Sequence, residues 1–62
     1  MKNKLKQARE KRGWTQEELS EKAGVSRATI SYIENGNAEC IKTNTLVKIA
    51  DAFGVKVTTL FF

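Results

Sequence analysis

The stretch TQEELSEKAGVSRATISYIENG, residues 15–36, holds two helix start signals in succession. Thr15 is followed three residues later by Glu18, the spacing of a capping box, in which each side chain accepts a hydrogen bond from a backbone N–H at the helix start. Ser26 is a second residue of the type that caps helix N-termini. Gly24 lies between the two signals and can end the first helix. The stretch therefore predicts two short helices joined by a turn that contains glycine.

The residues that precede the two caps support the same interpretation. Trp14 and Leu19 occupy the two positions of a hydrophobic staple for the first helix, and Val25 and Ile30 occupy those of the second. Two capped helices with such a turn form a helix-turn-helix, a motif whose second helix can lie in a DNA major groove. For Trp14, the staple position favours a packed structural role over stacking on a nucleic-acid base.

Apolar residues at helical spacing predict helices in the rest of the chain. Each expected helix has one apolar stripe, and none is stable alone at such lengths, so all must pack around one small core. We expect Leu60 and Phe61 to close that core, and we expect an all-α fold in a single domain, residues 1–62. The expected helices cover about 3–12, 16–23, 27–34, 43–53 and a last turn at 57–61, with a loop at 37–43.

Length and composition narrow the class of protein. A chain of 62 residues buries only ~60% of the surface that its unfolded form exposes. Cys40 is the single cysteine, and an unpaired thiol fits a reducing compartment. No apolar run approaches the ~18 residues of a membrane span, and the N-terminus lacks the apolar core of a signal peptide. We therefore expect a cytoplasmic protein with no membrane partner.

The net charge of +4 is unevenly distributed along the chain. Residues 1–12 contain six basic side chains against Glu10 alone, whereas residues 13–62 contain five basic and six acidic side chains. Positive charge on the first helix attracts nucleic acid. The alternative is a solvated helix face with ordinary lysines. Charge alone leaves both interpretations open.

Residues suited to catalysis or metal binding are scarce. The chain has no histidine, one cysteine and no glycine-rich phosphate loop. One cysteine without histidine cannot build a structural zinc site. We therefore expect no enzyme, no metal and no cofactor, and we interpret Cys40 as an incidental thiol in preference to a redox sensor.

The order and spacing of several short segments resemble one protein family. These segments are LKQAREKRGWTQEELSEKAGVSRATISYIENG, then LVKIADAFGV and the closing LF. They resemble the phage-repressor and Cro-like helix-turn-helix domains, called the Xre family, from about Leu5 to Phe61. The resemblance implies a compact five-helix lambda-repressor-like DNA-binding domain, with the helix-turn-helix at helices 2 and 3, which acts as a symmetric dimer.

The resemblance also implies roles for individual residues of this sequence. Arg9 and Glu34 match a structural ion pair between helix 1 and the end of helix 3. Gln16 matches a residue that bonds a DNA phosphate and supports the recognition helix. Positions that face the DNA groove are Arg27, Ala28, Thr29 and Tyr32, and positions that contact the sugar–phosphate backbone also include Asn35, Asn37 and Lys42.

The chemistry of these side chains is consistent with those roles. Arg27 can form a bidentate contact with guanine O6 and N7. Thr29 offers a hydroxyl or a methyl group, and Ala28 offers only a methyl group for a thymine. Tyr32 either contacts DNA or packs on the domain surface. Ser26, besides capping its helix, is a candidate donor to a phosphate.

One loop departs from the family pattern. Similar proteins often have basic residues and a proline after helix 3, whereas this chain has Ala38, Glu39, Cys40 and Ile41. An acidic residue close to DNA phosphates weakens the binding of this loop to the DNA backbone. We therefore expect the loop to contribute little to a backbone clamp.

The leading hypothesis is a sequence-specific regulator of transcription, a repressor that binds double-stranded DNA with helix 3 in the major groove. Few cations lie on its expected reading face, so affinity depends on a homodimer that binds a palindromic operator with half-sites about one helical turn apart. Its dimer interface is expected at Val57, Thr59 and Phe62. The alternative is an antitoxin-like or adaptor module that binds a protein partner, supported by Phe62 beside Phe61 and by the acidic loop.

Overall fold

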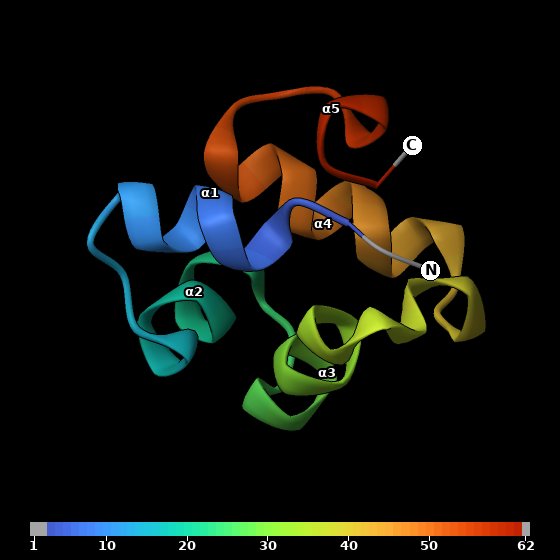
Figure 1. Ribbon diagram of the computed structural model, residues 1–62, viewed down its shortest axis with the longest axis horizontal. Coiled ribbons are helices and arrows are strands. Elements are labelled where there is room, and N and C mark those ends of the chain that lie inside the picture. The colour runs from blue at the N-terminus through green and yellow to red at the C-terminus, as the bar shows by residue number, and fades with distance from the viewer. Residues whose placement is uncertain (1–2, 62) are drawn as a thin grey trace.

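The computed structural model describes residues 3–61, and this part of the chain is all-α, as predicted (Figure 1). Residues 33–40 form a wide helical turn followed by a short 3-10 turn. None of the described helices has the length and apolar character needed to span a membrane. The elements are α1 (Leu5–Lys11), α2 (Gln16–Ala23), α3 (Arg27–Tyr32), η1 (Ile33–Asn37), η2 (Ala38–Cys40), α4 (Thr43–Phe53) and α5 (Val57–Phe61).

The helix starts predicted from local signals are confirmed. Thr15 Oγ1 accepts a hydrogen bond from Glu18 N at 3.0 Å, and Glu18 Oε1 accepts one from Thr15 N at 2.9 Å, which completes the capping box of α2. Ser26 Oγ accepts a hydrogen bond from Thr29 N at 3.1 Å and caps α3. Gly24 ends α2 with φ of +71°, a left-handed conformation that glycine adopts without steric cost. The turn between the two helices follows from these residues alone.

Predicted helix ends were less accurate where tertiary contacts intervene. The first helix was expected from residue 3, but Asn3 lies outside α1 because its side chain accepts from Leu5 N and donates to Ile33 O. The third helix was expected to reach residue 34, but regular α-helix ends at Tyr32. The chain then widens into η1, where Gly36 has φ of +95°. These long-range contacts leave no pattern in the local sequence.

The segment after Gly36 was predicted as a loop over residues 37–43, and this prediction was wrong in part. Ala38–Cys40 forms the 3-10 turn η2, in which the Ala38 side chain is fully buried. The Asn37 side chain donates to Tyr32 O at 3.2 Å, which closes η1 from its far end. Burial of Ala38 and this hydrogen bond together hold the segment in helical turns.

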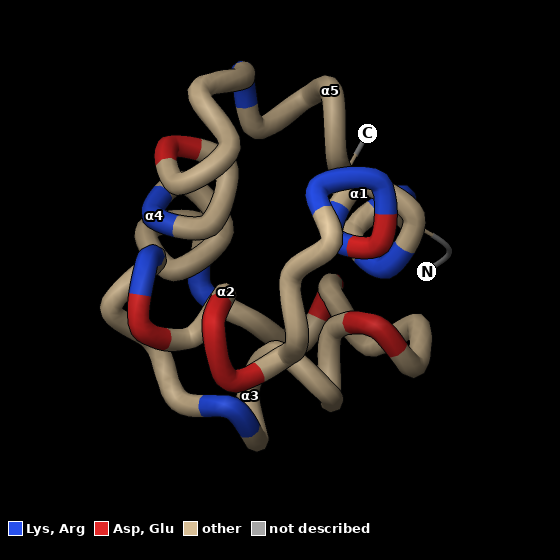
Figure 2. Tube along the Cα trace, turned by 90° about the vertical axis from the view of Figure 1, so that its left-hand side faces the viewer, with Lys and Arg blue, Asp and Glu red and all other residues tan. Residues whose placement is uncertain are grey.

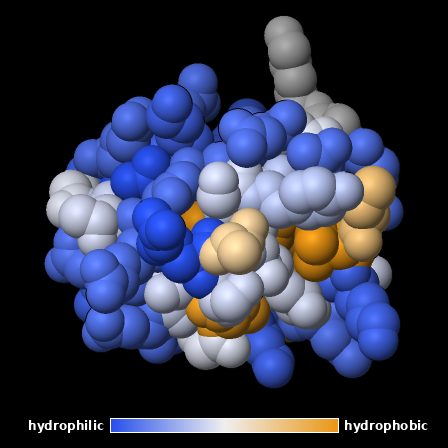
Figure 3. All heavy atoms as spheres, turned by 90° about the horizontal axis from the view of Figure 1, so that it is seen from below, coloured by the Kyte–Doolittle hydropathy of each residue, from blue (hydrophilic) through white to orange (hydrophobic). Residues whose placement is uncertain are grey.

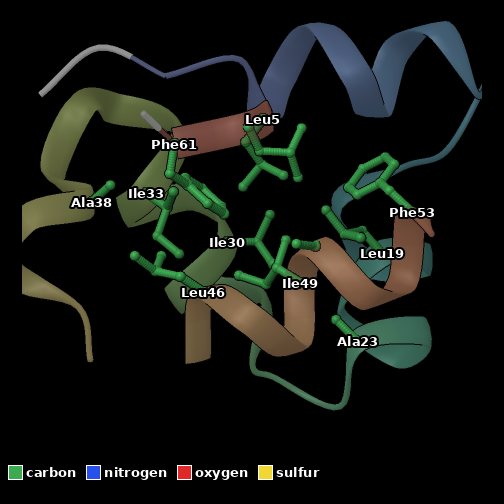
Figure 4. Packing of buried hydrophobic residues seen from close by; sticks show 12 residues of the cluster. Leu5, Leu19, Ala23, Ile30, Ile33, Ala38, Leu46, Ile49, Phe53 and Phe61 are labelled. Atoms are coloured by element: carbon green, nitrogen blue, oxygen red, sulfur yellow. The ribbon is translucent and has the colours of Figure 1, made fainter. Parts of the chain in front are cut away.

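One hydrophobic core joins all five α-helices and both turns (Figure 4). Leu60 and Phe61 of α5 are only 4% and 1% exposed, which confirms that α5 closes the core. A backbone hydrogen bond of 2.9 Å from Lys4 N to Leu60 O ties the start of α1 to this end of the chain. The fully buried large side chains are Leu5, Leu19, Ile30, Ile33, Ile49 and Phe61.

Trp14 has the packed structural role that its position predicted. Its half-buried ring lies 5.0 Å from the ring of Phe53, centroid to centroid, and packs against the core. The Arg12 guanidinium lies 5.4 Å from each of these two rings, and Lys22 Nζ lies 5.0 Å from the Trp14 ring. Arg12 also donates to Phe53 O at 3.0 Å. This cation–π cluster holds the end of α1 against the end of α4.

The arrangement of helices leaves α3 at one edge of the molecule. In both ribbon and tube views, α3 lies at the bottom and α5 at the top (Figures 1 and 2). Contacts between α2 and α3 hold the two helices of the helix-turn-helix together, and contacts between α2 and α4 connect the motif to the rest of the core. The outer side of α3, with the exposed Arg27 and Ala28, therefore faces away from the described core.

Candidate nucleic-acid interface

The side chains of α3 divide into a buried and an exposed set. Ile30, with Ile33 just after the helix, is fully buried. Arg27 and Ala28 in the first turn are exposed, and Tyr32 is 46% exposed one turn later. Seen from below, this side of the molecule is covered mainly by hydrophilic side chains with small apolar patches among them (Figure 3). Packing of the isoleucines thus sets which side chains of α3 point outward.

Thr29 lies at the boundary between these two sets. It is half-buried, and its Oγ1 lies 2.8 Å from Ser26 Oγ, within hydrogen-bond distance. Its backbone N–H also bonds Ser26 Oγ. The hydroxyls that were predicted to contact a base and a phosphate are thus already engaged with each other in the cap. Arg27, Ala28 and Tyr32 form the more exposed part of the expected reading face.

Arg9 and Glu34, which the family resemblance pairs, are in direct contact. Arg9 Nε donates to Glu34 Oε2 at 2.7 Å, and Arg9 Nη2 donates to Glu34 Oε1 at 3.2 Å. Their side chains are only 12% and 4% exposed. The hydrogen bond with Glu34, followed by a smaller Coulombic effect of the same carboxylate, raises the pKa of Arg9 despite its burial. This bidentate pair joins α1 to the turn that follows α3.

Gln16, the first residue of α2, is drawn into the same network. Its Nε2 donates to Glu34 Oε1 at 3.1 Å. Arg9 Nη1 donates to Trp14 O at 2.7 Å, immediately before the cap of α2. The start of α2 is therefore bonded to both members of the ion pair. Free backbone N–H groups and the helix dipole favour an anion at such a helix start.

The remaining backbone-contact candidates follow α3 along the chain. Asn35 in η1 is exposed, and Lys42 is exposed directly before α4. Asn37 is half-buried, and its amide nitrogen is used to bond Tyr32 O. The turns η1 and η2 therefore leave one amide and one ammonium group accessible on the stretch between α3 and α4.

The helix-turn-helix family model matches residues 5–60 of the chain. The chain belongs to this family. An uncharacterized HTH-type transcriptional regulator of Methanocaldococcus jannaschii is 48% identical over 61 residues, which cover 98% of this chain and 91% of the relative. The antitoxin HipB of Escherichia coli K12 is 39% identical over 56 residues, which cover 90% of this chain and 62% of HipB.

A solved structure agrees with the sequence comparisons. The crystal structure of SinR, a master regulator for biofilm formation, in complex with DNA matches the chain with a TM-score of 0.80 and 34% identity. The match covers 90% of this chain and 89% of the SinR chain. These findings confirm the predicted family and the five-helix lambda-repressor-like fold. The chain is a DNA-binding transcriptional regulator of the helix-turn-helix type, and family membership also confirms that it is not an enzyme.

The exposed Tyr32 of this helix-turn-helix domain has a neighbour that was not predicted from the sequence. The turns η1 and η2 bring Cys40, an exposed free thiol, beside the Tyr32 hydroxyl. A hydrogen bond with Cys40 raises the pKa of the Tyr32 phenol. No local signal predicts this contact, because it depends on how the two turns fold back.

The basic residues in α1 and at its two ends lie mostly away from α3 in this helix-turn-helix domain. Lys4 and Lys11 line a surface hollow of about 570 Å³ between α1 and α5. Arg12 stacks on Trp14 and Phe53, and Arg9 is paired with Glu34. Figure 2 shows α1 with its basic residues above α3. This placement favours structural or solvated roles for these cations over a role in the reading face.

The predicted dimer residues have different surroundings. Val57 is half-buried and packs against the core, so its side chain already has intramolecular contacts. Thr59 is exposed on α5. Phe62 lies outside the described residues.

Proposed function

We propose that this helix-turn-helix protein is a sequence-specific repressor that binds duplex DNA as a homodimer with α3 in the major groove. The observation that carries the proposal is the outward face of α3, where Arg27, Ala28 and Tyr32 are exposed while Ile30 is fully buried. A reading helix must present side chains to base edges and must be held rigidly from behind. The similarity to SinR, whose solved structure contains DNA, supports the same use of the fold.

The proposed contacts divide into base-reading and positioning groups. Arg27, at the first position of α3, bonds a guanine through O6 and N7, and the Ala28 methyl group packs on a thymine methyl. Tyr32 reaches a base edge or a neighbouring sugar one turn later, and Thr29 contributes from the edge of this face. The proposed backbone contacts come from Gln16, Ser26, Asn35, Asn37 and Lys42.

Dimer formation is part of the proposal because one copy offers few cations to DNA. Arg27 and Lys42 are the exposed basic residues of α3 and of the stretch that leads to α4. Two copies related by a twofold axis double these contacts and match a palindromic operator with half-sites about 34–36 Å apart. We propose that the dimer interface involves Val57 and Thr59 of α5, together with Phe62.

Selection from random duplex DNA tests this function. We expect recovery of a palindromic site whose half-sites are one helical turn apart and whose recovery requires Arg27. Recovery of a non-palindromic site would contradict the dimer, and recovery of no site would contradict sequence-specific binding. A reporter gene placed downstream of the recovered site then distinguishes repression from activation.

The second candidate is an antitoxin-like module that binds a protein partner. The 39% identity with HipB, an antitoxin, favours it, and so do the acidic Glu39 and the exposed Val47 of α4. The two candidates differ in their response to Arg27→Ala. A repressor loses its effect on the reporter gene when base discrimination is lost, whereas a protein-binding module keeps its cellular effect.

A further inference from the structure

The hydrogen bonds at the start of α2 connect Gln16 to a carboxylate that is itself held in place. Gln16 Nε2 donates to Glu34 Oε1 at 3.1 Å, across 18 residues of sequence. Both oxygens of Glu34 also accept hydrogen bonds from Arg9. Because the Glu34 side chain is almost fully buried, it has little freedom to move away from Gln16. The Gln16 amide is therefore fixed before any partner arrives.

The two ends of the Gln16 amide have opposite hydrogen-bonding properties. The nitrogen has two N–H donors, and the oxygen only accepts. An ionised carboxylate also only accepts, so the bond with Glu34 selects the orientation in which the amide nitrogen faces the carboxylate. That bond uses one N–H and leaves the second N–H for another acceptor. A phosphate oxygen is such an acceptor.

A carboxylate near DNA phosphates would repel them unless its charge were compensated. Arg9 provides the compensation through its two hydrogen bonds to Glu34. Arg9 also donates to Trp14 O, so the cation is anchored to the chain just before α2. The pair thus orients Gln16 while it presents no net negative charge at this point of the surface.

We propose that Glu34 is a positioning residue for DNA binding, which holds the Gln16 amide ready to donate to a phosphate of duplex DNA, with Arg9 neutralising the carboxylate. The inference rests on the proposed function and adds a residue that touches no DNA itself. For a substitution of Glu34, this role predicts a change in DNA affinity of the opposite sign to the change expected from charge alone. Removal of a carboxylate near DNA strengthens binding by long-range attraction, whereas removal of a positioning group weakens it.

Equilibrium binding to the selected duplex and to an unrelated duplex of equal length tests the proposal. The variants are Gln16→Ala, Glu34→Leu, which has no acceptor, and the double substitution, with Gln7→Ala on α1 as a matched control. We expect each single variant to weaken binding to both duplexes about five- to tenfold, the value of one hydrogen bond. The double variant binds no more weakly than Gln16→Ala, and the control binds like the unmodified protein.

Two further measurements separate positioning from folding. Circular dichroism under the binding conditions gives the folded fraction of each variant, and affinities are compared for folded protein. Should Glu34→Leu fail to fold, Arg9→Met with Glu34→Leu removes both charges together and leaves no unpaired ion. NMR signals of the Gln16 side-chain amide are expected to shift when DNA binds and to shift toward those of a free amide in either Glu34 variant.

The outcomes are distinguishable. Tighter or unchanged binding by the folded Glu34 variants, while Gln16→Ala weakens binding, would overturn the positioning role and leave the proposed function intact. Additive losses in the double variant would also overturn it, because independent residues add. Unmodified protein that binds no duplex would overturn the proposed function itself, and with it this inference.

Discussion

The two ends of α3 are built in different ways. At its start, Ser26 caps the helix through Thr29, three residues away, and Gly24 turns the chain just before. At its end, the chain is held by groups that are distant in sequence, because Glu34 bonds Arg9 across 25 residues and Ile33 O accepts from Asn3 across 30. One end is a local structure, and the other is a product of the tertiary fold.

This difference separates two properties that a recognition helix needs. The local start determines where α3 begins and therefore which residues lie in its first turn. The long-range end determines how α3 is oriented with respect to α1 and α2. Changes at the end are therefore expected to affect the whole domain, and changes at the start are expected to act on α3 or on its DNA contacts alone.

The largest effect is expected from Glu34→Ala. It leaves Arg9, with a side chain only 12% exposed, without its carboxylate partner. Breaking a buried ion pair by removing one member costs about 3–5 kcal/mol. Urea unfolding measures the loss in the free energy of unfolding. The matched variant Arg9→Met with Glu34→Leu is expected to be much closer to the unmodified protein, and equal losses in the two would contradict the long-range role of the pair.

Arg27→Ala is expected to act on recognition and to leave stability unchanged. The side chain is exposed in the first turn of α3. Loss of a bidentate contact with guanine removes about 1–3 kcal/mol of discrimination between the selected site and a site with that base changed. Competition binding with the two duplexes checks this, and Lys42→Ala serves as the control because it is expected to weaken both alike. Retention of full discrimination would show that another side chain reads the base.

Ser26→Ala tests the local end of the comparison. It removes the oxygen that accepts from Thr29 N, and loss of such a cap costs about 0.5–2 kcal/mol. Ser26→Asp keeps an acceptor at the same place and is expected to retain most of the stability. Thermal unfolding measures the stability of the two variants relative to the unmodified protein. A loss as large as that of Glu34→Ala would mean that the start of α3 is not a local structure.

The smallest effect is expected from acidification of the α2 capping box. Hydrogen bonds from Thr15, first from its backbone, lower the pKa of the exposed Glu18 carboxylate. Its contribution to stability is therefore fully present above the pKa of the unfolded chain and is lost as the pH falls through the lower pKa of the folded protein. Unfolding measured from pH 7 to pH 3 in the unmodified protein and in Glu18→Gln checks this. Identical pH profiles would contradict a role for the Glu18 charge.

Much of the fold was predictable because its signals are local. The capping box at Thr15, the cap at Ser26 and the left-handed Gly24 placed α2 correctly to the residue and also the start of α3. Burial of Leu60 and Phe61 followed from the need of short helices to share one core. Predictions were weaker at the end of α3, where regular helix ends at Tyr32 although it was expected to reach residue 34, and where η2 occupies part of the loop expected over residues 37–43.

Some features of the candidate interface were likewise predictable from local sequence, and others were not. The exposure of Arg27 and Ala28 follows from the helical position of Ile30, which the sequence shows. The engagement of the Thr29 hydroxyl with Ser26 and the contact of Tyr32 with Cys40 were not predicted. Family resemblance paired Arg9 with Glu34, but the hydrogen bond from Gln16 to the same carboxylate became visible only in the structure.

The sequence by itself determined that two capped helices meet at a glycine turn and that short amphipathic helices pack into an all-α domain. These properties depend on hydrogen bonds between residues three or four apart and on the period of the apolar residues. A short stretch of sequence is therefore sufficient to predict them. Only the tertiary structure decided that Gln16, Arg9 and Glu34 form one network and that most of the positive charge of α1 lies away from α3. Such contacts depend on how the helices pack. Packing brings together residues that are distant along the chain, and no local sequence pattern predicts which of them meet.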